Sequence, residues 1–375
     1  MYNITLLSPE VYPPRSGFSH RVWSMVRILS DFSNLSVLVT NGEGEEKPKD
    51  TNIKFQFEYP YKTGLRPQLK RLLTYYKTEY KKLTFDQIPD AIQVESLHLY
   101  MLTKHFPDRP IVFDDHNVYW NLLRAIYRDK PLYKKIISPW ILWRAKMFEI
   151  QAIKEAAHVF VASHSDRETL VKEINGIERK ISVIPNCIEV ERYKPGKLES
   201  ECGEKQIIFV GLLSYIPNKD AVQIICNKIA PKFDNSVRFQ IVGENPPPVE
   251  NKPENVEFTG FVKDVKSLIN KADICISPLR YGGGTRIKIL EYMAMKKPIV
   301  STSKGVEGLD VTNGRDVLLE DDLDKFATRI SELLQNERYS KELGKNARKL
   351  VAEKYDYKTY VENVRRVYDE ILSKR

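Results

Sequence analysis

Short apolar runs alternate along the chain with longer segments in which apolar residues recur about once per helical turn. The apolar runs of the first half predict strands at residues 3–8, 35–40, 53–59, 91–95, 111–113, 158–163 and 181–184. Segments between them, such as 17–32 and 165–174, have the periodicity of helices that bury one face. Strand–helix alternation of this kind is typical of a doubly wound parallel sheet.

The alternation breaks once, at residues 185–196, where two prolines and a glycine indicate a linker between domains. It then resumes, with strands predicted at 206–210, 238–242, 256–259, 274–278, 298–302 and 317–319, and helices near 219–230, 263–271, 322–335, 337–354 and 357–374. A chain of 375 residues is long for one ordinary core. We therefore expect α/β domains at 1–185 and 186–356, and a C-terminal helix, 357–375, that packs back on the first domain.

Composition places the chain among soluble globular proteins, with 42% hydrophobic and 29% charged residues. No apolar run approaches the ~20 residues that span a bilayer. The first residues, MYNITLLSPEVYP, lack the basic region of a signal peptide. The four cysteines are scattered without a CxxC pair, which argues against a metal or disulfide framework. We therefore expect a cytoplasmic protein without a bound metal.

The net charge of +9 is concentrated in one segment of the first domain. Residues 62–82 hold seven basic residues and one acid, and the pattern predicts an amphipathic helix at 65–83. The plain interpretation is that its lysines face water. The alternative hypothesis is that its cationic face, with Trp140 and Trp143, contacts an anionic membrane or a lipid-diphosphate acceptor. Net charge is the only support for nucleic acid, and without a compact aromatic–basic motif we expect no such partner.

The strongest chemical signal lies at residues 277–308, SPLRYGGGTRIKILEYMAMKKPIVSTSKGVEG. A strand leads into three glycines, and a helix predicted to start at Thr285 follows. Unpaired amides and the dipole at a helix N-terminus favour an anion, and two cations stand beside them. The alternatives are a plain turn and solvated surface charges. The anion site predicts a bound nucleoside diphosphate, and its residues are Gly282, Gly283, Gly284, Thr285, Arg286 and Lys288.

Two candidate positions follow predicted strands in the first domain. His116 stands in the sequence FDDHN after the strand at 111–113. A lone histidine is more often structural, but a strand-end position favours a functional role. Gly17 follows the first strand, where a residue without a Cβ lets a ligand approach the backbone. Ser16 beside it is a weaker candidate for contact with an acceptor substrate.

Five segments carry a resemblance to a known family, and they occur in the family's order. They are PRSGFSHR (14–21), FDDHN (113–117), VIPNCIEVERY (183–193), FVGLLSYIPNKDAV (209–222) and the stretch 277–308. Over nearly its full length the chain resembles the family 4 retaining glycosyltransferases. The resemblance implies the GT-B fold, in which two Rossmann-like domains face each other across a cleft. It also implies a nucleotide-sugar donor held by the second domain, an acceptor held by the first, and no metal.

The resemblance also implies roles for individual residues. Arg286 and Lys288 would stabilise the leaving diphosphate, Glu291 would bind the ribose, and His116 would contact the transferred sugar. Two departures stand out. Gly283 occupies the position of a sugar-binding glutamate in many members, and Leu212 that of a phosphate-binding arginine.

The function that follows is transfer of a sugar, with retention, to a hydroxyl of a glycan, glycolipid or lipid-linked saccharide. The acceptor hydroxyl would attack from the face that the diphosphate leaves. Two alternatives remain open at this point. One is a sugar-nucleotide epimerase or phosphorylase of the same fold, and the other is a non-catalytic nucleotide-sugar-binding protein.

Overall fold

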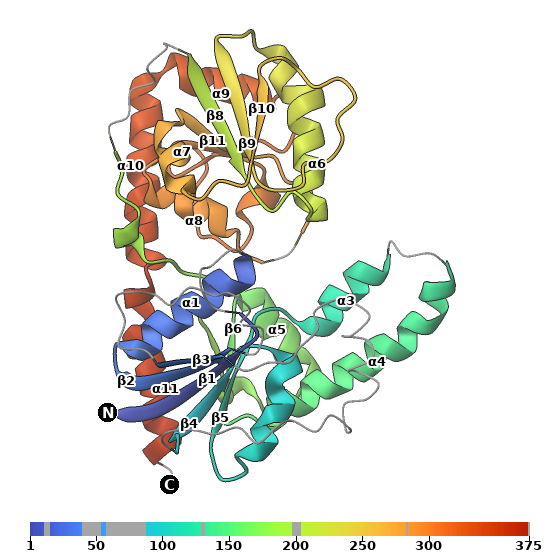
Figure 1. The fold of residues 1–375 in the computed structure, drawn as a ribbon, viewed down its shortest axis with the longest axis vertical. Coiled ribbons are helices and arrows are strands. Elements are labelled where there is room, and N and C mark those ends of the chain that lie inside the picture. Colours follow the sequence, from blue (N-terminus) through green and yellow to red (C-terminus); the bar gives the residue numbers. More distant parts are fainter. Residues whose placement is uncertain are drawn as a thin grey trace. The chain divides into compact units, whose positions relative to one another are not determined.

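The computed structural model divides the chain into two compact units, and each is built on one parallel sheet (Figure 1). The described residues are 1–10, 16–39, 54–57, 88–128, 132–196, 204–282 and 284–373. Unit 1 comprises Met1–Asn186 with Tyr360–Arg375, and unit 2 comprises Cys187–Thr359. The predicted class, two doubly wound parallel-sheet domains, is confirmed. The predicted helix 65–83 lies outside the described residues.

The sheet of unit 1 has seven parallel strands in the order β3-β2-β1-β4-β5-β6-β7. Their bounds are β1 Tyr2–Ser8, β2 Ser33–Val39, β3 Lys54–Phe57, β4 Ala91–Val94, β5 Ile111–Asp115, β6 His158–Val161 and β7 Ile181–Val183. The central strands β4, β5 and β6 are buried along their whole length, because helices cover both faces of a parallel sheet. Strand order reverses between β1 and β4, which makes the carboxyl ends of these strands the expected place for a ligand.

Helices and short 3₁₀ segments accompany these strands. They are α1 (Gly17–Ser30), the 3₁₀ segment Leu97–His105, α3 (Tyr119–Arg128), α4 (Leu132–Glu155), α5 (His164–Glu173), the 3₁₀ segment Glu178–Lys180 and α11 (Val361–Ser373). Helices α3 and α4 form a hairpin that projects beyond the sheet of its unit (Figure 1). Within the described residues, no helix combines the length and apolarity needed to cross a membrane.

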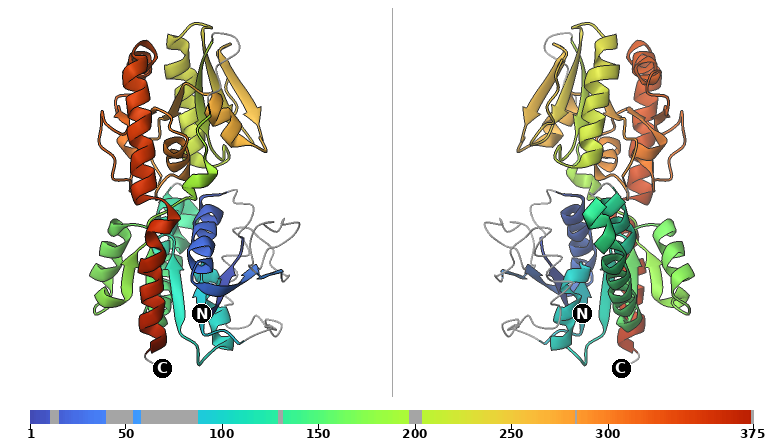
Figure 2. Two further views of the ribbon diagram at one scale, coloured as in Figure 1. Left: turned by 90° about the vertical axis from the view of Figure 1, so that its left-hand side faces the viewer. Right: turned by 90° about the vertical axis from the view of Figure 1, so that its right-hand side faces the viewer.

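Helix α11 completes unit 1, although unit 2 separates it from the rest of that unit in the sequence (Figure 2). It packs against α1. The Tyr368 hydroxyl donates to Gln93 Oε1 at 2.6 Å, and the Tyr2 hydroxyl donates to Asp369 Oδ1 at 2.6 Å. Both Tyr368 and Gln93 are fully buried. The C-terminal helix is therefore part of the core of unit 1.

The sheet of unit 2 has six parallel strands in the order β10-β9-β8-β11-β12-β13. Their bounds are β8 Lys205–Val210, β9 Val237–Val242, β10 Val256–Gly260, β11 Ile274–Ser277, β12 Ile299–Ser301 and β13 Leu318–Leu319. The helices are α6 (Ile216–Ile224), which continues as a π-helical turn, α7 (Val265–Lys271), α8 (Ile287–Ala294), α9 (Phe326–Gln335) and α10 (Glu337–Lys354). Order reverses between β8 and β11, so their carboxyl ends mark the corresponding site in this unit.

The start of α8 differs from the prediction. The helix begins at Ile287 rather than at Thr285, because Arg286 has an extended backbone with φ −84° and ψ 107°. Gly282 and Gly284 precede it with φ of +115° and +74°. These left-handed glycines turn the chain twice after β11, and the helix can start only after the second turn. Thr285 and Arg286 therefore belong to the loop.

Replacement of Tyr368 by Phe tests the link between α11 and the sheet. The change removes one hydroxyl and leaves the buried Gln93 carbonyl without its donor. We expect the free energy of unfolding to fall by about 1–3 kcal/mol, the cost of an unsatisfied buried polar group. Urea denaturation measures it. The exposed Glu362→Gln on the same helix is the control and should change stability by less than ~0.5 kcal/mol.

Candidate functional site

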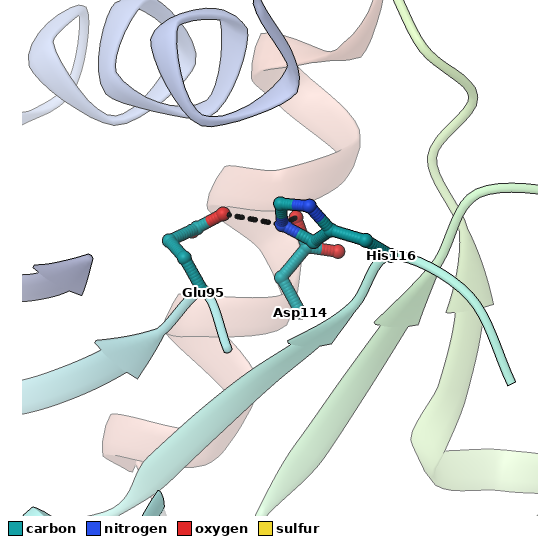
Figure 3. A group of neighbouring side chains, drawn as sticks. All are labelled: Glu95, Asp114 and His116. Atoms are coloured by element: carbon teal, nitrogen blue, oxygen red, sulfur yellow. Dashed lines mark hydrogen bonds and ion pairs between the residues drawn. The ribbon is translucent and has the colours of Figure 1, made fainter. Parts of the chain in front are cut away.

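A network of buried polar side chains lies at the carboxyl ends of β4 and β5 in unit 1 (Figure 3). Glu95 directly follows β4. Asp114 is the next-to-last residue of β5, and His116 directly follows that strand. His116 Nε2 lies 3.0 Å from Glu95 Oε2 and 3.4 Å from Asp114 Oδ2. Arg21 of α1 binds both oxygens of Asp114, with Nε at 2.9 Å from Oδ2 and Nη2 at 2.5 Å from Oδ1.

Further hydrogen bonds hold the two outer members of this network, Glu95 and Arg21. Gln93 donates from Nε2 to Glu95 Oε1 at 2.5 Å, which holds the second oxygen of that carboxylate. Arg21 also donates from Nη1 to the Ile184 carbonyl at 2.7 Å and to Asn186 Oδ1 at 3.3 Å. The imidazole of His116 is thus held through Nε2, and its ring packs against Phe18 with centroids 4.5 Å apart.

Burial and the neighbouring charges shift the pKa values of the ionisable groups in this network. Burial and the charge of Asp114 raise the pKa of Glu95 to about 7. Burial alone would raise the pKa of Asp114, but Arg21 and His116 outweigh it and lower that pKa. Burial would lower the pKa of His116, but Asp114 and Glu95 outweigh it and raise that pKa. The network therefore favours an imidazolium at His116, between two acids.

Glu95, Asp114 and His116 each place one potential ligand atom within 4.8 Å of the others, close enough for a cation. Both Asp114 oxygens, however, already accept from the Arg21 guanidinium. A metal ion would have to displace that bidentate contact and stand beside a second positive charge. The donor set therefore fits a hydrogen-bonded ion network better than a metal site.

Ser16 and Gly17 lie at the start of α1. Ser16 is the N-cap: its Oγ accepts from the Ser19 amide at 3.1 Å, and Ser19 Oγ accepts from the Ser16 amide at 2.9 Å. This capping box gives Ser16 a structural role. A Cβ built on Gly17 would meet no atom within 4 Å among the residues that the structure describes, so their packing does not itself demand a glycine there.

In unit 2, Lys288 lies in the first turn of α8 and contacts residues of β8 and α6. Its ammonium donates to Asn218 Oδ1 at 2.9 Å and lies 4.0 Å from the centroid of the Phe209 ring. Asn218 in turn donates to the Leu212 carbonyl at 2.9 Å. A Cβ at Gly211 would approach Lys288 Nζ to 2.9 Å, so glycine permits this close contact.

Lys288 carries its charge without a carboxylate within 4 Å among the residues that the structure describes. Burial, with the nearby charge of Arg286, lowers the pKa of Lys288 to about 7. Burial also lowers the pKa of Arg286, whose Nη1 donates to the Gly284 carbonyl at 2.9 Å. Two desolvated cations at a glycine loop form a site that an anion would stabilise. Gly283 lies outside the described residues.

Glu291 lies one turn along α8 from Lys288. It accepts from the Tyr193 hydroxyl at 2.9 Å through Oε1, which fixes the orientation of the carboxylate. Lys266 lies over the ring of Tyr193, 4.8 Å from its centroid. A carboxylate held in this way can accept from hydroxyl groups of a ligand through Oε2.

The structure brings together some of the predicted residues and adds others. In unit 2 it places Gly282, Gly284, Arg286 and Lys288 around one loop, with Glu291 one turn further. The prediction missed Asn218 and Tyr193, although both stand in segments that carried the resemblance. In unit 1 it missed Glu95 and Arg21. Glu95 has a signal like that of His116, because it is a polar residue at the carboxyl end of a predicted strand, 91–95.

The remaining positions of interest in unit 2 are Leu212, Lys219, Glu307 and Thr285. Leu212, one of the two departures from the family pattern named above, is exposed, and so is Lys219 on α6. Glu307 forms a surface ion pair with Lys304 at 2.7 Å. Thr285 is buried close to Gly308.

Solved glycosyltransferase structures share this fold over nearly the full chain. HepE of Anabaena, in complex with UDP and glucose, superposes with a TM-score of 0.65 at 14% identity and covers 98% of this chain and 100% of its own. A glycosyltransferase from Rickettsia africae superposes with a TM-score of 0.64 at 15% identity, with 100% of both chains covered. The fold is that of the GT-B glycosyltransferases.

Two family models match consecutive parts of the sequence. Residues 17–192 match Glycosyltransferase Family 4, and residues 204–336 match Glycosyl transferases group 1. The chain belongs to the family 4 glycosyltransferases. It is also 24% identical over 211 residues to the UDP-Gal:alpha-D-GlcNAc-diphosphoundecaprenol alpha-1,3-galactosyltransferase of Escherichia coli. That match spans 50% of this chain and about half of the relative, 51% of its length.

Replacement of Glu95 by Gln tests the ion pair with His116. The variant keeps the shape of the side chain but removes the carboxylate whose hydrogen bond, together with the larger effect of Asp114, raises the pKa of His116. We expect the pKa of His116 to fall, so that the imidazolium is lost at a lower pH than in the wild type. Titration of the histidine ring protons by NMR measures it.

His158 provides an internal control for that titration. Burial lowers its pKa to about 4, and its Nε2 lies 3.0 Å from Ser182 Oγ rather than near Glu95. Its titration should be the same in both proteins. An unchanged His116 titration in the variant would contradict the ion pair.

Proposed function

We propose that this protein transfers a sugar from a nucleoside-diphosphate sugar to a hydroxyl acceptor, with retention at the anomeric carbon and without a metal ion. Membership of family 4 supports the reaction class. The observation that carries the proposal is Lys288, a desolvated ammonium at the carboxyl edge of the sheet. Within the described residues it has an amide partner but no carboxylate within 4 Å.

The chemistry of the leaving group follows from this charge. A departing diphosphate gains negative charge in the transition state, and cations fixed beforehand in a desolvated site stabilise it without reorganising. Arg286 and Lys288 supply those cations, and the amides of Gly282, Gly284 and Thr285 supply neutral donors. The acceptor hydroxyl then attacks from the face that the diphosphate leaves, and a leaving phosphate oxygen takes its proton. This front-face route gives retention.

Three further roles complete the proposal for the donor. Glu291, held by Tyr193, binds the ribose hydroxyls. His116 contacts the transferred sugar, where an imidazolium can donate a hydrogen bond to a sugar oxygen. Gly17 admits a ligand beside the backbone of α1.

For the acceptor we propose a saccharide linked to a lipid diphosphate. The support is the Escherichia coli relative, whose name specifies GlcNAc-diphosphoundecaprenol as its acceptor. Ser16 is engaged in the capping box, so any contact with the acceptor would use its remaining hydrogen-bonding capacity. UDP-sugars are the first donors to test.

A thermal-shift screen tests donor binding. A ligand that binds only the folded state at ~100 times its Kd stabilises it by about 2.7 kcal/mol. We expect one or more UDP-, GDP- or dTDP-sugars to raise the Tm, and the shift to vanish in the double variant Arg286→Ala, Lys288→Ala. The same variant should lose ~10²-fold or more in kcat/KM once a substrate pair is known.

The matched control neutralises two exposed cations of the same unit, Lys228→Ala with Arg338→Ala, and should keep the full shift. A panel without any shift in the wild type would refute the donor site. Donor converted in the absence of acceptor would indicate an epimerase instead. EDTA should leave turnover unchanged.

The pKa of Lys288 predicts how donor binding depends on pH. The diphosphate of a nucleotide sugar stays ionised above pH 7, while Lys288 loses its proton there because its pKa is about 7. Binding needs the ammonium, so Kd should rise with pH between 7 and 9, by up to about tenfold per pH unit. Calorimetry in buffers of different ionisation enthalpy should detect proton uptake. Lys288→Arg, charged throughout, should bind without this pH dependence.

A further inference from the structure

Exposed apolar side chains gather on the α3–α4 hairpin of unit 1. Trp143 is 58% exposed, Trp140 47%, Leu122 42% and Met147 41%. Trp140, Trp143 and Met147 follow one another at helical spacing, so they share one face of α4. Apolar side chains grouped on one exposed face mark a surface that meets another apolar phase.

The hairpin does not need this face for its own folding. Its internal core consists of Leu123 and Tyr127 of α3 against Ile141 and Ala145 of α4. These four residues are buried, and they lie on the faces where the two helices meet. The tryptophans of α4 therefore point away from the packing that holds the hairpin together.

The exposed face changes character along α4. Trp140, Trp143 and Met147 occupy its first two thirds, and the exposed residues that follow are Gln151, Lys154 and Glu155. The apolar part thus lies nearer the end of α4 that connects to α3, which is the end that projects from the unit (Figure 1). This arrangement suits shallow insertion of the apolar end of the hairpin into the boundary between water and an apolar phase.

The sequence of the hairpin is strongly basic. Residues 119–155 contain eight Lys and Arg and three Asp and Glu, and one of those acids, Glu149, is buried. The Arg144 guanidinium lies 5.7 Å from the centroid of the Trp140 ring, and Arg124 of α3 is exposed. Lys146 is paired with Glu173. Charge complementarity therefore favours a negatively charged partner.

We propose that the α3–α4 hairpin docks on the surface of an anionic phospholipid bilayer, with Trp140, Trp143 and Met147 in the headgroup region. Tryptophan is enriched at that depth because its ring is apolar and its N–H is polar. Five of the eight basic residues are lysines. Lysine is depleted from protein interfaces but is attracted to anionic lipid, so the bilayer fits better than a protein partner or a second copy. The proposal does not depend on the reaction proposed above.

Vesicle binding of the full chain tests it. We expect sedimentation with phosphatidylcholine vesicles that contain phosphatidylglycerol, weaker binding to pure phosphatidylcholine, and a decrease with salt. Trp23 and Trp120 are buried, so a blue shift of tryptophan emission on binding would report Trp140 and Trp143. The double variant Trp140→Ser, Trp143→Ser should lose roughly tenfold or more in vesicle affinity.

Phe261→Ser, which removes an exposed aromatic residue of unit 2, is the matched control and should bind vesicles as the wild type does. Circular dichroism and Tm confirm that each variant is folded. Failure of the wild type to bind anionic vesicles would overturn the proposal, as would equal binding by the double variant. Self-association that the double variant abolishes, without vesicle binding, would assign the face to a second copy instead.

Discussion

Charge buried at the carboxyl ends of parallel strands is the constraint on which both units depend. The edge collects polar residues because every strand of a parallel sheet ends there, while the covering helices exclude water. A buried ionisable group must then pair with an opposite charge, or its pKa shifts so that the neutral form is favoured. In unit 1 the partners are internal: Arg21 neutralises Asp114, and His116 lies between Asp114 and Glu95.

Unit 2 resolves the same constraint differently. Lys288 has a neutral amide partner, and burial lowers its pKa toward neutrality instead. A pre-formed carboxylate partner would stabilise the free protein but would compete with an anionic ligand. The two sheets thus use one architecture for two electrostatic states, a closed network and a cationic site. The second state suits the diphosphate binding and release proposed for this site.

Local patterns were sufficient to predict most strands and helices, because each is encoded by a periodic run within a few residues. They also predicted the glycine loop and its cations, which are contiguous in sequence. The start of α8 was wrong, since the pattern does not show that Gly284 takes a left-handed turn. The network of unit 1 was beyond local patterns: Glu95 and His116 are 21 positions apart, and Arg21 and Asp114 are 93 apart.

The contact between Tyr368 and Gln93 also has a consequence for synthesis. It joins positions 275 residues apart, and all of unit 2 lies between them in the chain. A ribosome therefore delivers the complete unit 2 before it delivers α11. Unit 2 has all its strands at that moment and can fold, while the Glu95–His116 network still lacks the helix that holds Gln93. Chain topology thus completes the inserted unit before the unit that encloses it in sequence.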